Sequence, residues 1–317
     1  MTTNSRINPN ISPSARTARH CGSSASASSV GITRLIGAVK GNSCHRSRAP
    51  CSSPGALLYH EARQTRNHHG TRTMTTRRIL RLSGPETEEF LQGLISNDIR
   101  KLDQGMVYAA LLTPQGKFLA DFFLARDGES VLLDVAEPLA DDLLRRLMMY
   151  KLRAKVTIAP AGLNLQRGTG PAPEGALADP RDPAMGWRAY TSAPEGDDGS
   201  DWDAIRVAHC IPETGIELAP ETYILEAGFE RLNGVDFRKG CYVGQEVTAR
   251  MKHKTDLRKG LARVAVEGEA PVGTEITADG KPAGVLFTQS GGQAIAYLRF
   301  DRSQAEMQAG GVTVRRL

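Results

Sequence analysis

The sequence predicts an α+β protein that ends in a small all-β module, and three observations carry that prediction. Helical and strand-like segments follow the order strand, helix, several strands, helix, which differs from the regular alternation of a doubly wound α/β fold. From Lys259 onward, short strand-like runs alternate with turns containing glycine and proline, as in a small barrel. At 317 residues, with 40% apolar and 24% charged residues, the chain is long enough for about two globular domains.

The first 73 residues differ from the rest in charge. They carry nine Arg, one Lys and one acidic residue, Glu61, for a net charge of +9, whereas residues 74–317 carry −4. The segment is rich in Ser and has no sustained period of 3.6 or 2, so we expect it to be disordered. Its composition fits a mitochondrial presequence. It also fits a false upstream start with Met74 as the initiator, which we favour.

Residues 74–165 form the first predicted α+β part. It opens with a strand, and Ser83-Gly84-Pro85-Glu86 resembles a helix start with Ser83 as the N-cap. Further strands are expected near 106–112, 117–125, 131–133 and 156–158, and a helix over 138–150. The helix is the clearest element, because Leu139, Leu143 and Leu147 recur at helical spacing.

Residues 166–255 form the second predicted α+β part, and residues 256–317 form the barrel. The second part opens with a loop rich in Gly, Pro and Asp over 168–183 and contains a helix near 202–210. The barrel strands are expected at 261–266, 275–278, 284–289, 294–300 and 312–315. Because no run of about 18 apolar residues occurs, we expect no membrane span.

The most informative stretch is the signature Lys239-Gly240-Cys241-Tyr242-Val243-Gly244-Gln245-Glu246. It places a cation, a thiol, an amide and a carboxylate within eight residues, which core packing alone does not require. If residues 237–242 are extended, Lys239 and Cys241 share a face, and the ammonium favours the reactive thiolate. A helix is expected from about Gly244, with Glu246 in its first turn. Gly240 and Gly244 would allow positive φ and the close approach of a ligand.

Plainer interpretations of the same residues stay open. Cys241 also suits a small buried apolar position, and Lys239 suits an ion pair with Glu246. The cations that follow fit an anionic ligand or RNA phosphates, but also a solvated surface. They are Arg250, Lys252, His253, Lys254, Arg258 and Lys259. No aromatic residue interleaves them, which disfavours a surface for stacking RNA bases.

Other common functional patterns are absent from the sequence. It contains no GxxxxGK[ST] loop, no GxGxxG after a strand, no GxSxG and no HExxH. The five cysteines form no CxxC pair, and the His and Cys spacings match no zinc site, so no metal site is expected. A disulfide framework is not expected either, which favours a reducing compartment. We therefore expect a cytoplasmic protein, or a mitochondrial matrix protein if residues 1–73 are a presequence.

Residues 239–246 resemble the signature of the YgfZ-type folate-binding proteins, relatives of the glycine-cleavage T-protein, an aminomethyltransferase. The resemblance extends over Met74–Leu317. Its other landmarks are Phe90-Leu91-Gln92-Gly93 with Asn97-Asp98, Thr113-Pro114-Gln115-Gly116-Lys117, Tyr150-Lys151-Leu152-Arg153 and Gly234-Val235-Asp236-Phe237. It implies a T-protein-like architecture of two mixed α+β domains plus a C-terminal small β-barrel. It also implies tetrahydrofolate binding and a role in building or maintaining iron–sulfur clusters.

The resemblance also implies site residues. Lys239 and Cys241 match the family's functionally important lysine and cysteine. Asp121 lies near the place of the T-protein's folate-contacting acid. The remaining candidate folate-binding residues are Asn97, Gly240, Tyr242, Gly244, Gln245, Glu246 and Arg250.

The leading hypothesis is a tetrahydrofolate-binding accessory factor that supports iron–sulfur client enzymes or assembly proteins, with Cys241 as the functional thiol. The alternatives are a folate-dependent one-carbon transferase, since the T-protein is an aminomethyltransferase, and an RNA-binding or adaptor protein. The net charge of −4 over residues 74–317 disfavours a nucleic-acid partner.

Overall fold

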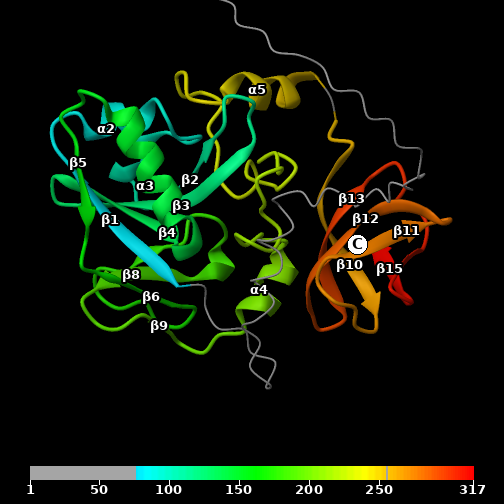
Figure 1. The fold of residues 1–317 in the computed structure, drawn as a ribbon. Coiled ribbons are helices and arrows are strands. Elements are labelled where there is room, and N and C mark those ends of the chain that lie inside the picture. Colours follow the sequence, from blue (N-terminus) through cyan, green and yellow to red (C-terminus); the bar gives the residue numbers. More distant parts are fainter. Residues whose placement is uncertain (1–75, 255) are drawn as a thin grey trace, which may run out of the picture. The chain divides into compact units, whose positions relative to one another are not determined.

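The computed structural model describes residues 76–254 and 256–317 (Figure 1). The expectations for residues 1–73 lie outside these described residues. The first of two open sheets has five strands in the order β2-β3-β4-β1-β5, and its neighbouring strands pair antiparallel. The strands are β1 (Arg77–Ser83), β2 (Val107–Leu112), β3 (Phe118–Asp127), β4 (Ser130–Ala136) and β5 (Thr157–Pro160).

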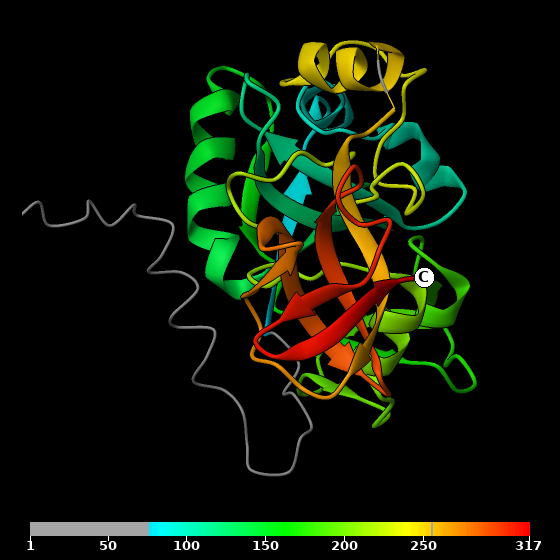
Figure 2. The same ribbon diagram turned by 90° about the vertical axis from the view of Figure 1, so that its right-hand side faces the viewer.

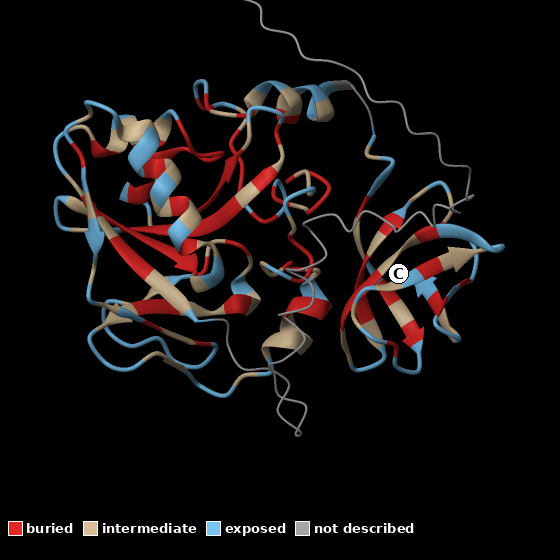
Figure 3. Cartoon of the chain, in the orientation of Figure 1, coloured by how far each residue is buried: buried red, intermediate tan, exposed pale blue. Residues whose placement is uncertain are grey.

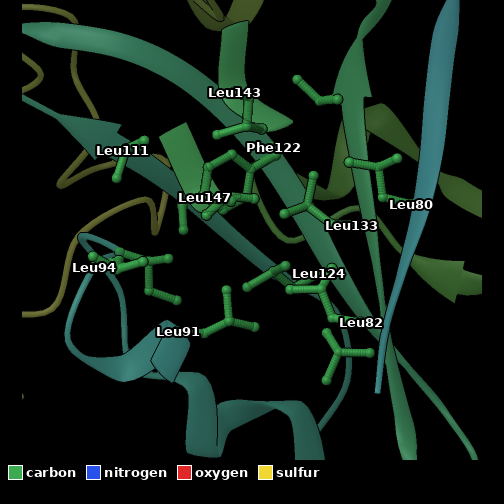
Figure 4. Close-up of a cluster of buried hydrophobic side chains, with 14 of the residues drawn as sticks. Leu80, Leu82, Leu91, Leu94, Leu111, Phe122, Leu124, Leu133, Leu143 and Leu147 are labelled. Carbon is green, nitrogen blue, oxygen red and sulfur yellow. The ribbon is translucent and has the colours of Figure 1, made fainter. Parts of the chain in front are cut away.

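This sheet is buried on both faces. One face packs against α2 (Thr87–Gln92), α3 (Glu137–Lys151) and the 3-10 helix η2 (Ile99–Asp103). Figure 4 shows the resulting first core, in which Leu91 of α2 and Leu143 and Leu147 of α3 meet the strands. The opposite face packs against residues from the second half of the chain, among them Ile211, Phe229 and Tyr242, to form a second core.

Two buried faces explain why these strands do not alternate cleanly between apolar and polar residues. All six residues of β2 are buried. In β3 the consecutive residues Phe122 and Phe123 belong to the first and the second core respectively. The predicted strands and the helix of this region are confirmed, with end positions that differ by a few residues.

The second sheet has four strands in the order β7-β8-β6-β9, and only its β6–β9 pair is parallel. The strands are β6 (Asn164–Gly168), β7 (Leu177–Ala178), β8 (Trp187–Thr191) and β9 (Gly196–Asp197). None of them was predicted, because they are short and separated by segments rich in Gly, Pro and Asp. The short 3-10 helix η3 (Pro183–Met185) precedes β8. The predicted helix near 202–210 is confirmed as α4 (Trp202–His209).

The C-terminal region is a closed barrel with the strand order β10-β13-β12-β11-β14-β15, which confirms the predicted barrel (Figure 2). Its strands are β10 (Lys259–Glu267), β11 (Thr274–Ala278), β12 (Lys281–Ser290), β13 (Gln293–Arg299), β14 (Met307–Ala309) and β15 (Val312–Arg316). Small and branched apolar side chains such as Val264, Ala296 and Val314 fill its interior. The three-residue β14 was not predicted, since so short a strand shows no period.

The expected N-cap at Ser83 is wrong. Ser83 is the last residue of β1, and α2 begins at Thr87 without a side-chain hydrogen bond from its N-cap, Glu86. Gly84 lies between them with φ +119°, and a Cβ there would come within 2.2 Å of the carbonyl oxygen of Lys155. The chain therefore turns at Gly84 before it can start a helix. No helix in the described part of the chain is long and apolar enough to cross a membrane.

Candidate functional site

The signature begins in a turn, and the expectation of an extended segment over 237–242 is wrong. Lys239 is 4% exposed, whereas Cys241 is exposed. The Nζ of Lys239 donates hydrogen bonds to the carbonyl oxygens of Gln92, at 2.7 Å, and Ile95. These carbonyls lie at and just beyond the C-terminal end of α2, where a cation is favoured. Lys239 therefore points into the protein and Cys241 points out, so the two side chains do not share a face.

The surroundings of Lys239 act on its pKa in two directions. Removal from water lowers the pKa of Lys239 to about 8, although the carboxylates of Asp98 and Asp236 oppose this change. The Nζ also lies 4.8 Å from the centroid of the Tyr242 ring, a cation–π contact. The hydrogen bonds tie the loop to the end of α2, and the ring contact joins Lys239 to Tyr242 across the loop. Lys239 therefore acts as an anchor of the loop.

A second anchor forms where the signature enters helix α5 (Gln245–Lys254). Gly244 has φ +85°, and a Cβ there would lie 2.6 Å from the carbonyl oxygen of Thr113. Gly116 has φ +74° and lies close to Val247 of α5. A Cβ added at Gly116 would lie 2.9 Å from the Cβ of Val247. The Thr113–Lys117 turn and the signature, far apart in the sequence, thus pack together. The predicted positive φ is confirmed for Gly244.

Gly240 behaves differently from Gly244. Its φ lies outside the positive region, so the expectation of positive φ there is wrong, and a Cβ would meet nothing within 4 Å. Gly240 and Cys241 are both exposed, between the buried residues Lys239 and Tyr242. The loop is therefore held at both ends and open in the middle, where the thiol lies.

The start of α5 is confirmed at Gln245, and Glu246 lies in its first turn. The carboxylate of Glu246 pairs with Arg250, at 2.5 Å, so it does not pair with Lys239. Gln245 is half-buried, while Glu246 and Arg250 are exposed. These three side chains lie on the helix that follows the thiol loop.

The cations after residue 250 are partly neutralised. Besides Arg250, Lys252 pairs with Glu230 at 2.5 Å and Lys259 approaches Glu226 at 3.8 Å. A surface that pairs its cations internally offers fewer of them to phosphates. This weakens the RNA-binding alternative.

Asn97 and Asp121 are both buried, but their surroundings differ. The Asn97 amide donates to the backbone oxygens of Tyr108, at 2.8 Å, and Asn233, at 2.6 Å. Asp121 accepts hydrogen bonds from the Tyr108 hydroxyl, at 3.0 Å, and from the Thr214 hydroxyl. Tyr108 belongs to the second core, which Tyr242 also joins.

Asn97 lines one pocket, and Glu226 and Lys259 line another. One, of about 300 Å³, is lined by Asn97, Lys101, Gln104, Gly105, Met106, Val107, Tyr108, Pro180 and Asn233. The other, of about 400 Å³, is lined by Glu226, Met251, Asp256, Leu257, Arg258, Lys259 and Arg299. Cys241 lines neither of these two pockets, and its thiol is exposed to solvent on a loop.

A buried cluster of charges was not predicted. Asp134 of β4 accepts hydrogen bonds from Arg77 of β1, at 2.6 Å, and from Arg188 and Tyr190 of β8, which we call the Asp134 cluster. Burial alone would raise the pKa of Asp134, but the two guanidinium groups outweigh it and lower the pKa to about 2. The cluster joins the two open sheets. Sequence periodicity cannot reveal it, because Asp134 lies more than 50 residues from each of its three hydrogen-bond donors.

Comparison with a family model finds the C-terminal β-barrel domain of CAF17 at residues 258–316. The mouse mitochondrial iron–sulfur cluster assembly factor IBA57 is 31% identical over 270 residues, which cover 70% of this chain and 75% of the relative. Human IBA57 is 30% identical over 268 residues, again covering 75% of the relative. A Mycosarcoma maydis homologue is 34% identical over 218 residues, and this chain spans about half, 54%, of that relative's length.

Among solved structures, aminomethyltransferase T of the glycine cleavage system from Bartonella henselae aligns with a TM-score of 0.62, over 81% of this chain and 87% of that one. At 15% identity this likeness concerns the fold alone, and it confirms the T-protein-like α+β prediction. These mouse, human and Mycosarcoma maydis relatives are IBA57 proteins, so the comparisons support that family and leave the YgfZ-type prediction unconfirmed. Those relatives are named mitochondrial, which leaves the cytoplasmic expectation without support.

Proposed function

Because this chain belongs to the IBA57 family of iron–sulfur cluster assembly factors, we propose that it supports the assembly or repair of iron–sulfur clusters in other proteins, with Cys241 as its functional thiol. The observation that carries the proposal is an exposed thiol on a loop whose two ends are held by buried residues. A thiolate is a soft ligand suited to iron. Clusters are held by several thiolates, so Cys241 supplies one ligand and a partner protein supplies others.

The test is complementation in cells that lack the native gene. Cys241→Ser should restore iron–sulfur enzyme activities poorly, while enzymes without iron stay normal. Cys210→Ser is the matched control, because Cys210 is partly buried and burial raises its pKa to about 11. Full rescue by Cys241→Ser would remove the thiol from the mechanism.

Tetrahydrofolate is the ligand that we propose for the same protein. Asp121 supports this proposal, since a carboxylate has about four acceptor sites and two are used by Tyr108 and Thr214. The remaining sites suit the N–H donors of a pterin edge. Asn97 and Tyr108 line the 300 Å³ pocket, and the Tyr108 hydroxyl reaches Asp121. When bound, the folate would supply a reduced pterin that can carry a one-carbon group.

Calorimetric titration of tetrahydrofolate into the purified chain tests the ligand. Asp121→Asn should weaken binding at least tenfold, while Asp279→Asn, at an exposed turn of the barrel, should leave it unchanged. Equal binding by all three proteins would exclude Asp121 as a contact. Turnover of an aminomethyl donor in the presence of tetrahydrofolate would establish the transferase alternative instead.

The mitochondrial matrix is the compartment that we propose. It is supported by the names of the relatives and by the Arg-rich, acid-poor composition of residues 1–73. A fluorescent protein fused behind residues 1–73 should enter mitochondria. A diffuse cytoplasmic signal would count against this location.

A further inference from the structure

Exposed apolar side chains gather at one end of helix α3. Within residues 76–254 and 256–317, four large apolar side chains are exposed. One is the terminal residue Leu317. The other three are Met148 (50% exposed), Met149 (64%) and Leu152 (86%), all within five residues at the C-terminal end of α3. Figure 3 shows exposed turns along this helix, whose opposite side packs into the first core. We call these three residues the α3 tip.

Leu152 lowers the stability of the fold and gains no burial in return. Its φ of +43° and ψ of −104° lie in a region that glycine adopts freely and a leucine does not. Such a conformation costs about 1–3 kcal/mol. An exposed leucine recovers almost none of this cost by burial. A leucine at this position is therefore better explained by a contact outside the chain than by folding.

Unpaired cations surround the α3 tip. In the described part of the chain, the side chains of Lys151, Arg153 and Lys155 make no ion pair. One turn earlier, Arg145 and Arg146 share a single carboxylate, Asp142. The tip is thus an apolar contact with a positive border. Its complement is an apolar surface bordered by carboxylates.

We propose that the α3 tip is a docking surface for another protein that presents an apolar patch bordered by Asp and Glu. The chain's own residues 1–73 are a poor occupant because their net charge of +9 repels the positive border. A second copy would bring the same positive border against this one. Methionine is common at protein-binding surfaces because it adapts its shape, whereas Tyr150, an aromatic residue of the kind that favours membrane interfaces, is half-buried against the first core.

The first test separates docking from folding. Leu152→Gly should raise the melting temperature of the purified chain or leave it unchanged, because the glycine relieves the positive-φ conformation. The same variant, with photoreactive p-benzoylphenylalanine in place of Met149, should give several-fold less cross-linked product with another protein than the chain that keeps Leu152. A lower melting temperature for Leu152→Gly would overturn the proposal, since it would mean that Leu152 stabilises the fold.

The second test identifies what covers the tip. The full chain carries the photoreactive residue p-benzoylphenylalanine in place of Met149, and a matched chain carries it at the exposed barrel residue Gln308. Light should join the first chain, and not the second, to one protein at a segment of apolar residues flanked by Asp or Glu. The double variant Arg153→Glu, Lys155→Glu should reduce the adduct at least fivefold. Cys241→Ser should keep it, so that docking and thiol function fail separately.

Other results of this experiment would overturn the proposal. They are equal labelling from the two positions, an adduct with a second copy or with residues 1–73, and an adduct that survives the charge reversal. Binding of the purified chain to vesicles of anionic phospholipid, lost in Leu152→Gly, would assign the tip to a membrane surface instead.

Discussion

The signature loop and the Asp134 cluster both bury a charged side chain, but they stabilise it differently. The Lys239 ammonium meets two carbonyl oxygens, whereas the Asp134 carboxylate meets two guanidinium groups and a hydroxyl. Full opposite charges outweigh the cost of leaving water, so the pKa of Asp134 falls to about 2. Carbonyl dipoles and more distant carboxylates do not, so burial lowers the pKa of Lys239 to about 8. The comparison teaches that charged partners in direct contact keep a buried group ionised more firmly than carbonyl oxygens and distant carboxylates do.

The largest expected effect comes from breaking the Asp134 cluster. Arg188→Met removes one guanidinium from a fully buried carboxylate, and should destabilise the fold by about 3–5 kcal/mol. Urea unfolding measures this. Arg299→Met is the control, because the exposed Arg299–Asp301 pair should contribute less than about 1 kcal/mol. Similar losses in the two variants would contradict the difference drawn between buried and exposed pairs.

The second effect concerns the Lys239 anchor. Lys239→Met removes both hydrogen bonds to the end of α2 and should lower the free energy of unfolding by about 1–3 kcal/mol. Hydrogen exchange should speed up at residues 92–95 and 239–242. Lys252→Met, at an exposed ion pair, should change neither quantity measurably. An unchanged exchange pattern in Lys239→Met would mean that Lys239 does not hold the loop.

The third prediction compares the two glycines of the signature. Gly244→Ala should cost more than about 1 kcal/mol, because it combines a positive φ with a clash against the Thr113 carbonyl oxygen. Gly240→Ala should be nearly neutral, since the space around it is open. Thermal unfolding of both variants decides this. An equal loss of stability in the two variants would mean that the Gly244 end of the loop is not packed more tightly than its middle at Gly240.

The smallest effect is a pH dependence. An unfolded lysine has a pKa of about 10.4, so the unfolded chain binds more protons at position 239 between about pH 8 and about pH 10. Stability relative to Lys239→Met should therefore rise as the pH increases through this window. Urea unfolding at about pH 7 and about pH 9.5 measures the difference. A difference that stays flat or falls would show that Lys239 is not neutralised in the folded state.

Sequence periodicity predicted two kinds of element. One is a helix with a long apolar stripe, and the other is a series of strands that follow one another with turns between them. The 138–150 helix and most barrel strands were found because their apolar residues recur at a helical or strand spacing. The second sheet was missed because β7 and β9 have only two residues each, and because segments rich in Gly, Pro and Asp separate its strands. Ser83 was misread because a serine before Pro and Glu looks like an N-cap, and only the close approach of Lys155 to Gly84 shows otherwise.

The position of the site in the sequence could be predicted from its residue types, but the contacts that its side chains make could not. Lys239, Cys241 and Glu246 stood out as chemistry concentrated in a short stretch. Their partners lie far away in the sequence, Gln92 among them, and no local spacing indicates which groups will meet. The predicted direction of the Lys239 side chain was wrong for this reason. The segment forms a turn, whereas the prediction of a shared face with Cys241 assumed a strand.

The double burial of the first sheet has a consequence for how the strands find their alignment. The register of a strand with one apolar face is set by the burial of that face. Strand β3 presents apolar residues to two cores. A register shift of one residue would therefore still bury them. Such a slip would, however, carry Asp121 and, in β4, Asp134 into a core of leucine and phenylalanine, away from their hydrogen-bond donors. The two carboxylates thus favour a single register of the strands in this sheet.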